Sequence, residues 1–184
     1  MRRIRGLRYI ERFNFHHVNR RQTVAEHSYF VAYYAMIIAK LLGEDEGLAC
    51  KLAMLHDVHE VVTGDMPHLY EKTIDIKLLE HSYAGCVTEG YFKEGTQPQY
   101  SNIIEDIVEF ADLFEVKIYL EEERKSGNMH LFNIEREVYM ELIKFDLDRN
   151  AKDEMICCIE PVKPKDETNA MTHEGEQWEK LRSI

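Results

Sequence analysis

Four side chains that can bind a divalent metal ion follow one another along the chain: His27, the doublet His56-Asp57, and Asp112. Apolar residues flank the doublet, and Asp112 interrupts an apolar helical stripe, so each group needs a partner, because burying an unpaired polar group is costly. One interpretation of the doublet alone is a hydrogen-bonded pair that closes a contact between helices. Two imidazoles and two carboxylates from three helices also make a mixed nitrogen and oxygen site for a divalent ion.

The spacing of these histidines excludes the zinc-protease pattern. That pattern needs two histidines four residues apart on one helix, with a glutamate directly after the first. Here His59 follows His56 by three residues, and Glu60 comes after the second histidine.

Helices must position these residues, and the hydrophobic pattern is helical nearly throughout. Thr23 and Glu26 form a capping box that begins a helix, and Gly43 ends it. Leucines at helical spacing predict a second helix over residues 45–62, so the His56-Asp57 doublet would lie within a helix. Glycine and proline in the following segment stop that helix.

The rest of the chain divides into further helices and a tail. We expect helices over 74–92, 104–127 and 133–149, with a loop at 95–98. The helical pattern decays after residue 151, where 157–161 could be a buried strand or a loop and 163–176 is polar, with Trp178 available to attach it to the body. We therefore predict one domain over 1–150, which includes the basic N-terminal segment, and a tail over 151–184 that packs on the domain or trails from it.

Composition restricts the class of protein. The chain has 184 residues, of which 45% are hydrophobic and 31% charged, which is enough apolar material for a packed core. No apolar run approaches the roughly 18 residues that span a bilayer, so no membrane is expected as a partner. The four cysteines form no CxxC pair, which indicates free thiols in the reducing cytosol.

Charge is distributed unevenly. Residues 1–21 hold seven arginines and one acid, whereas the rest of the chain carries 16 basic and 33 acidic side chains. An acidic body is a poor surface for nucleic acid, so nucleic acid is not expected as a partner. The basic segment could be a nucleic-acid arm, a transit peptide, or a lobe whose arginines reach a small phosphate ligand.

The ordered set of a histidine, a His-Asp doublet and a later aspartate resembles the metal-binding signature of the HD-domain phosphohydrolases. Within that class, the chain is similar to the YfbR-like 5'-deoxynucleotidase family over about residues 7–150. The similar segments are 24–28, 56–67, 111–112, 119–120 and 127–128. The resemblance implies an all-α HD domain of five or six helices around a central metal.

The resemblance also implies roles for individual residues. The residues that match the metal ligands are His27, His56, Asp57 and Asp112. Glu60 matches the catalytic carboxylate. Asp65 matches a catalytic residue that contacts the nucleotide and helps to handle the water. Helical spacing from the doublet places Glu60 on the same side as the metal ligands.

Residues that would bind the substrate come from two segments. Arg12 and Phe13 match an Arg-Trp pair that orients the phosphate and packs against the deoxyribose, and a planar guanidinium suits a phosphate. The aromatic residue is Phe13 rather than Trp, so the sugar contact can differ. After Pro67 the chain departs from the family pattern, and His68 there is a candidate substrate contact.

The implied activity is the removal of phosphate from deoxyribonucleoside 5'-monophosphates by a cytoplasmic homodimer with one divalent ion. These ligands do not distinguish Co, Mn, Zn, Fe, Ni and Mg. One alternative is a deoxynucleoside triphosphate triphosphohydrolase that uses the same site, with Lys72, Lys77 or Lys117 meeting the extra phosphates. Another is an inactive metal-binding regulatory module, although such a module has no need for the arginine and carboxylates beside the ligands.

Overall fold

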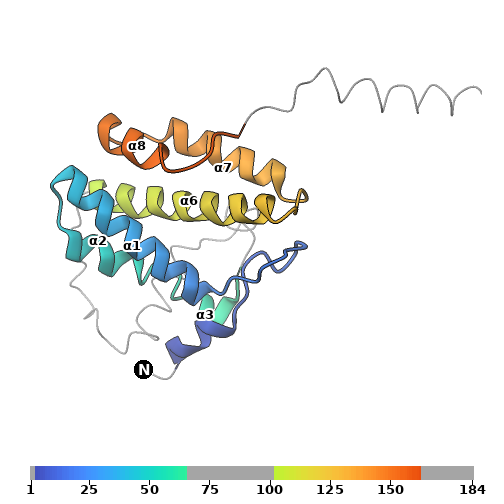
Figure 1. The fold of residues 1–184 in the computed structure, drawn as a ribbon. Coiled ribbons are helices and arrows are strands. Elements are labelled where there is room, and N and C mark those ends of the chain that lie inside the picture. Colours follow the sequence, from blue (N-terminus) through green and yellow to red (C-terminus); the bar gives the residue numbers. More distant parts are fainter. Residues whose placement is uncertain (1–2, 66–101, 163–184) are drawn as a thin grey trace, which may run out of the picture.

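The computed structural model describes residues 3–65 and 102–162, and in these ranges the protein is helical without strands (Figure 1). This result confirms the all-α class. The described elements are η1 (Arg3–Tyr9, a 3₁₀ helix), α1 (Val24–Leu42), α2 (Glu46–Ala53), α3 (Glu60–Thr63), α6 (Asn102–Lys125), α7 (Phe132–Lys144) and α8 (Arg149–Ile156). These seven exceed the expected five or six. The helix expected at 74–92, the loop at 95–98, His68 and the polar tail lie outside the described residues.

Helix α1 begins and ends as its capping residues predict. The Thr23 hydroxyl accepts from the backbone N–H of Glu26 at 3.2 Å, and the Glu26 carboxylate accepts from the N–H of Thr23 at 2.8 Å. Gly43 ends the helix with a φ of 73°, a left-handed conformation that favours glycine. Local hydrogen bonds and backbone conformation therefore determine where α1 begins and ends.

Helix α6 lies in the middle of the fold, with α1 and α2 on one side and α7 on the other (Figure 1). The main hydrophobic core lies between these helices, and its largest fully buried side chains include Ile38, Ile107, Phe110 and Leu142. A smaller apolar cluster, centred on Leu7, Val24 and Val58, packs η1 against α1 and the chain before α3.

The predicted continuous helix over 45–62 is wrong, because α2 ends at Ala53 and α3 begins only at Glu60. The intervening turns use hydrogen bonds that span three residues, such as Val58 N–H to Leu55 C=O. The imidazole Nδ1 of His56 lies 2.6 Å from the Ala53 carbonyl oxygen, the acceptor that a continuing α-helix would offer to a later backbone N–H. The doublet thus lies on a tight turn rather than within a helix.

The predicted helix over 133–149 is too long. Helix α7 ends at Lys144, and Phe145 is extended with a ψ of 135°. Asp148 then caps α8 by accepting from the N–H groups of Asn150 and Ala151. Met155 on α8 and Ile159 beyond it belong to the main core, so the chain up to Ile159 packs on the domain. Residues 157–161 form a turn and a short loop there rather than a strand.

Candidate metal centre and active site

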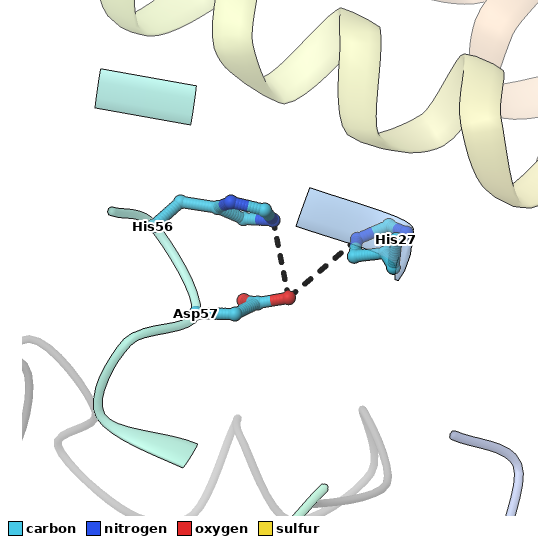
Figure 2. A group of neighbouring side chains, drawn as sticks. All are labelled: His27, His56 and Asp57. Carbon is cyan, nitrogen blue, oxygen red and sulfur yellow. Dashed lines mark ion pairs between the residues drawn. The ribbon is translucent and has the colours of Figure 1, made fainter. Parts of the chain in front are cut away.

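Histidines from two elements meet one aspartate at the centre of the molecule. His27 comes from α1, and His56 and Asp57 come from the turn between α2 and α3 (Figure 2). The ligand atoms of the three residues all lie within 4.8 Å of one another. Asp57 Oδ2 lies 3.1 Å from His56 Nε2 and 3.5 Å from His27 Nε2. Helix α6 adds Asp112, whose Oδ1 is 2.9 Å from His27 Nε2.

The second nitrogen of each imidazole fixes its tautomer. His27 Nδ1 faces the carboxylate of Glu115 at 2.5 Å, and His56 Nδ1 faces the carbonyl of Ala53. Both partners are acceptors, so Nδ1 carries a proton in each ring, and each Nε2 points to the centre, where it can bind a metal ion when it is not itself protonated. Imidazoles that bind metals in proteins are oriented in the same way.

Three atoms of the centre are buried and have no hydrogen-bond partner within the part of the chain that the structure describes. These atoms are His27 Nε2, His56 Nε2 and Asp112 Oδ1. Burial alone would lower the pKa of His56, but Asp57 and Asp112 raise it to about 9, so the two carboxylates attract positive charge to this point. A divalent metal ion can supply that charge and replace the ring proton on Nε2. The donor set of nitrogen and oxygen atoms therefore fits one divalent metal ion.

The charge of the centre is that of ionised carboxylates. Burial alone would raise the pKa of Asp57, but His56, His27 and Arg12 together hold the pKa of that carboxyl far below its usual range. The pKa of Asp112 is likewise lowered, against the effect of burial, chiefly by its contact with His27.

Glu60 is a buried acid beside the centre that keeps a proton at neutral pH. Glu60 is 7% exposed, and its Oε2 has no hydrogen-bond partner among the residues that the structure describes. Burial and the nearby charge of Asp57 raise the pKa of Glu60 to about 9. A protonated carboxyl group beside a polar centre can serve as a general acid.

Arg12 and Phe13 enter the site from the chain before α1. Arg12 Nη1 donates to Asp57 Oδ2 at 3.3 Å, while its buried Nε has no partner in the described ranges 3–65 and 102–162. Phe13 stacks on Tyr119 with ring centroids 5.2 Å apart. Asn14 Nδ2 donates to the backbone carbonyl of Asp65 at 3.3 Å, and burial and the charge of Asp57 raise the pKa of Asp65. The structure thus places Arg12, Phe13 and Asp65 beside the candidate metal ligands.

Two residues that support the metal centre were not predicted from the sequence. Glu115 is 3% exposed and orients His27, and Gln22 holds Glu115 through a 2.6 Å hydrogen bond from its amide. Glu115 follows Asp112 by three residues, so both project from one face of α6. A second acid in the same apolar stripe was the signal that could have identified it.

An all-α fold that gathers two histidines and two aspartates in this order is that of the HD-domain phosphohydrolases. The chain belongs to one family of that class: the model of the YfbR-like 5'-deoxynucleotidases matches residues 1–152. The protein is therefore a hydrolase that acts on phosphate esters of deoxynucleotides. None of the curated proteins matches the sequence.

Solved structures share the fold at low sequence identity. The HD phosphohydrolase DatZ of cyanophage S-2L, described as bound to dA and one catalytic Zn²⁺ ion, is 20% identical with a TM-score of 0.64, and the match covers 86% of this chain and 92% of DatZ. The PH0347 protein of Pyrococcus horikoshii OT3 is 21% identical with a TM-score of 0.65, over 83% of this chain and 92% of that one. A conserved hypothetical protein of Pyrococcus furiosus is 24% identical with a TM-score of 0.65, over 83% and 95%.

Among the described residues, no helix is long and apolar enough to cross a membrane.

Proposed function

We propose that the protein hydrolyses deoxyribonucleoside 5'-monophosphates to the deoxynucleoside and inorganic phosphate, with one divalent ion held by His27, His56, Asp57 and Asp112. The observation that carries the proposal is the set of buried central atoms without hydrogen-bond partners, beside an arginine with a free N–H. A divalent ion there would supply Lewis acidity toward a phosphate oxygen and toward water. DatZ, which shares the fold, is described with a catalytic Zn²⁺.

Two side chains beside the centre have separate roles in the reaction: Arg12 binds the phosphate and Glu60 transfers a proton. The unpaired Nε–H of Arg12 donates to a phosphate oxygen, and its charge offsets the negative charge that develops in the transition state. Burial alone would lower the pKa of Arg12, but the nearby carboxylates of Asp57 and Asp112 raise it. Arg12 therefore stays charged. Water oxygen bonds to phosphorus as the P–O5' bond breaks, and Glu60 transfers its proton to the departing O5'; one proton of the water stays on the phosphate, and the other restores the proton of Glu60.

The sugar faces Phe13, and Asp65 contacts the nucleotide. An apolar ring leaves the 2'-hydroxyl of a ribose without a hydrogen-bond partner, which favours deoxyribose. Asp65 is joined to this segment through the hydrogen bond from Asn14 to its backbone carbonyl, and its carboxyl group can help to position the water. His68, also proposed to contact the substrate, lies outside the described residues.

One lysine that was considered for the extra phosphates of a triphosphate has other partners, which supports a monophosphate as the substrate. Lys117, the one described lysine considered for extra phosphates, is fully buried and paired with Glu121 and Glu135 at 2.8 and 3.1 Å. It therefore cannot reach a phosphate chain at the metal centre. Lys72 and Lys77 lie outside the described residues.

The test is a phosphate-release screen over ribo- and deoxynucleoside mono-, di- and triphosphates, with Mn, Co, Zn, Ni, Fe or Mg supplied in turn. We expect orthophosphate from deoxynucleoside monophosphates. Release of tripolyphosphate from a deoxynucleoside triphosphate would instead identify a triphosphohydrolase. Metal binding without turnover of any substrate would identify a regulatory module. The Asp57→Ala variant, which should lose both metal and activity, is the control for a contaminating phosphatase.

We further propose a cytoplasmic homodimer. The family resemblance suggests the dimer, and the described cysteines Cys50, Cys157 and Cys158 are free thiols, as the reducing cytosol would keep them. Light scattering at several protein concentrations measures the oligomeric state, and a monomer at every concentration would contradict the dimer.

A further inference from the structure

The segment that carries Arg12 and Phe13, residues 10–22, is a loop closed at its base. Glu11 and Thr23 form an isolated antiparallel bridge. The N–H of Arg12 donates to the Gln22 carbonyl at 2.8 Å, and the N–H of Val24 donates to the Ile10 carbonyl at 3.0 Å. These bonds fix the two ends of the loop but leave the residues between them to be held by something else.

The loop contains a strained residue at the substrate contact. Phe13 has a φ of 55°, a left-handed conformation that bulky residues rarely adopt. Strain of this kind persists only where the surrounding structure enforces it, and it concentrates at functional sites. A set of contacts must therefore keep Phe13 in this conformation.

The far part of the loop is held through its backbone by the end of α6. Glu123, which is 2% exposed, accepts from the N–H of Asn19 at 2.7 Å and from the N–H of Arg20 at 2.8 Å. Asn128 donates to the same carboxylate at 2.7 Å and to the His17 carbonyl at 2.8 Å. Both carboxylate oxygens of Glu123 are thus used to hold the loop.

Tyr119 connects this anchor to the substrate contact. Its hydroxyl donates to the Arg20 carbonyl at 2.7 Å, and its ring stacks on Phe13 with an interplanar angle of 19°. One buried side chain therefore binds the loop backbone at one end and supports the aromatic ring at the other. Tyr119 and Asn128 belong to the segments that resemble the family, yet neither has a role in the chemistry proposed above.

We propose that Glu123, together with Tyr119 and Asn128, is a positioning residue for substrate: it fixes loop 10–22 so that Arg12 meets the phosphate and Phe13 the sugar. This inference rests on the proposed function. Glu123 follows Asp112 by eleven residues, roughly 16 Å along the helix axis, so it acts on the loop and not on the metal ligands.

The experiment compares Glu123→Ala with Glu122→Ala. Glu122 is the matched control, because its exposed carboxylate pairs with the side chain of Arg20 at 3.5 Å and not with the loop backbone. Three quantities are measured: the rate of trypsin cleavage after Arg20 and Arg21, Mn²⁺ affinity by calorimetry, and the ratio of kcat/KM for dAMP over AMP.

We expect Glu123→Ala to speed cleavage at these arginines at least tenfold, to raise the KM for dAMP, and to move the dAMP/AMP ratio toward one, while Mn²⁺ affinity stays within about twofold. Glu122→Ala should match the parent in all three. Glu123→Gln, which keeps one acceptor oxygen, should fall between them; a purely global loss of stability would not change the dAMP/AMP ratio.

A Glu123→Ala protein with parental cleavage and a parental dAMP/AMP ratio overturns the inference, as does a loss of Mn²⁺ affinity equal to the loss in kcat/KM. If that variant does not fold, Tyr119→Phe replaces it: it removes one hydrogen bond, keeps the ring, and should speed trypsin cleavage with little change in sugar preference. Unchanged cleavage in Tyr119→Phe would also overturn the inference. Failure of the proposed function is seen separately, as a parent protein that hydrolyses no deoxynucleotide.

Discussion

The two histidines of the metal centre are oriented by acceptors of different strength. His56 Nδ1 faces a backbone carbonyl, which no substitution removes, whereas His27 Nδ1 faces the carboxylate of Glu115. A carboxylate both fixes the tautomer and raises the basicity of the ring. Glu115 is therefore the residue outside the ligand set through which metal affinity can be changed most directly.

We predict that Glu115→Ala lowers the affinity for Mn²⁺ or Zn²⁺ by roughly 10- to 100-fold, because His27 loses its orientation. Glu115→Gln, whose amide oxygen can still accept, should lose less. Calorimetric titration of metal-free protein measures both values. Glu109→Ala, an exposed position on the same helix, is the control, and equal affinities in the Glu115 and Glu109 variants would contradict the prediction.

Glu60 should matter for the chemical step rather than for binding. We predict that Glu60→Gln lowers kcat by roughly 10²–10⁴-fold, the usual loss for one acid–base group, while metal still binds and KM changes little. Steady-state kinetics at saturating metal measures the loss. Activity within a few-fold of the parent would return Glu60 to a structural role.

Arg12 and Phe13 should have separable effects on substrate. Arg12→Ala should weaken every phosphorylated substrate whatever its sugar, because the donor to phosphate is lost. Phe13→Ala should lower the ratio of kcat/KM for a deoxyribonucleotide over that for the matching ribonucleotide. An unpaired buried hydroxyl costs about 1–3 kcal/mol, which is roughly 5- to 150-fold in kcat/KM. Matched pairs such as dAMP and AMP measure it, and equal rates on both in the parent would contradict sugar discrimination by Phe13.

Local sequence signals predicted the elements that local contacts determine. The capping box at Thr23 and the helix stop at Gly43 correctly predicted both ends of α1, and the apolar stripe predicted α6. The division between α2 and α3 escaped prediction because the leucine spacing continues through it, while the hydrogen bond from His56 to Ala53 leaves no mark on hydrophobic periodicity. Asp148, a common N-cap type, was an unused signal for α8.

The site was predictable as a set of residues but not as an arrangement. The order of His27, the doublet and Asp112 indicated a metal site, and the structure brings these residues together. The anchoring of loop 10–22 depends on pairs such as Asn19 and Glu123, which lie 104 residues apart in the sequence. Nothing in the local pattern around either residue indicates its partner.

The approach of η1 to α3 depends on a glycine. A Cβ atom at Gly6 would lie 2.8 Å from Val61 Cγ2, closer than side chains tolerate. We predict that Gly6→Ala lowers the free energy of unfolding by about 1–3 kcal/mol, because the residue overpacks this contact. It should also lower kcat, since α3 carries Glu60.

The matched control is the double variant Gly6→Ala/Val61→Ala, which removes the clashing methyl groups. Urea unfolding of the two single variants and the double variant measures the coupling between the positions. We expect the double variant to lose less free energy of unfolding than the sum of the losses in the two single variants. Strict additivity would contradict a direct clash between η1 and α3.

Distant parts of the chain are connected by an ion-pair network between α6, α7 and Glu160, in which Lys117 and Glu135 are fully buried and Glu160 is exposed. Lys117 pairs with Glu121 and with Glu135 of α7, and Arg124 pairs with Glu135 and with Glu160, beyond α8. Charges buried in this way are costly unless each is paired, so removal of one partner leaves an uncompensated charge. The network accounts for a buried lysine that has no role at the site.

Glu121 makes the network sensitive to acid. Its carboxylate accepts from Lys117 and Lys125 and from the N–H of Glu160 at 3.0 Å. Burial alone would raise the pKa of Glu121, but these hydrogen bonds lower it to about 2, from a usual value of 4.5. Because the folded-state pKa is the lower one, Glu121 stabilises the fold above about pH 4.5, and this stabilisation is lost as the pH falls toward 2.

We therefore predict that Glu121→Gln lowers the free energy of unfolding by about 1–3 kcal/mol at pH 7, the usual value of hydrogen bonds to a charged group. The difference from the parent should shrink between pH 5 and pH 3, since protonation removes from the parent what the substitution removes from the variant. Urea unfolding at pH 7, 5 and 3 measures it. Glu141→Gln, at an exposed position of α7, should show no such dependence, and a Glu121→Gln difference that is constant with pH would show that the charge of Glu121 does not stabilise the network.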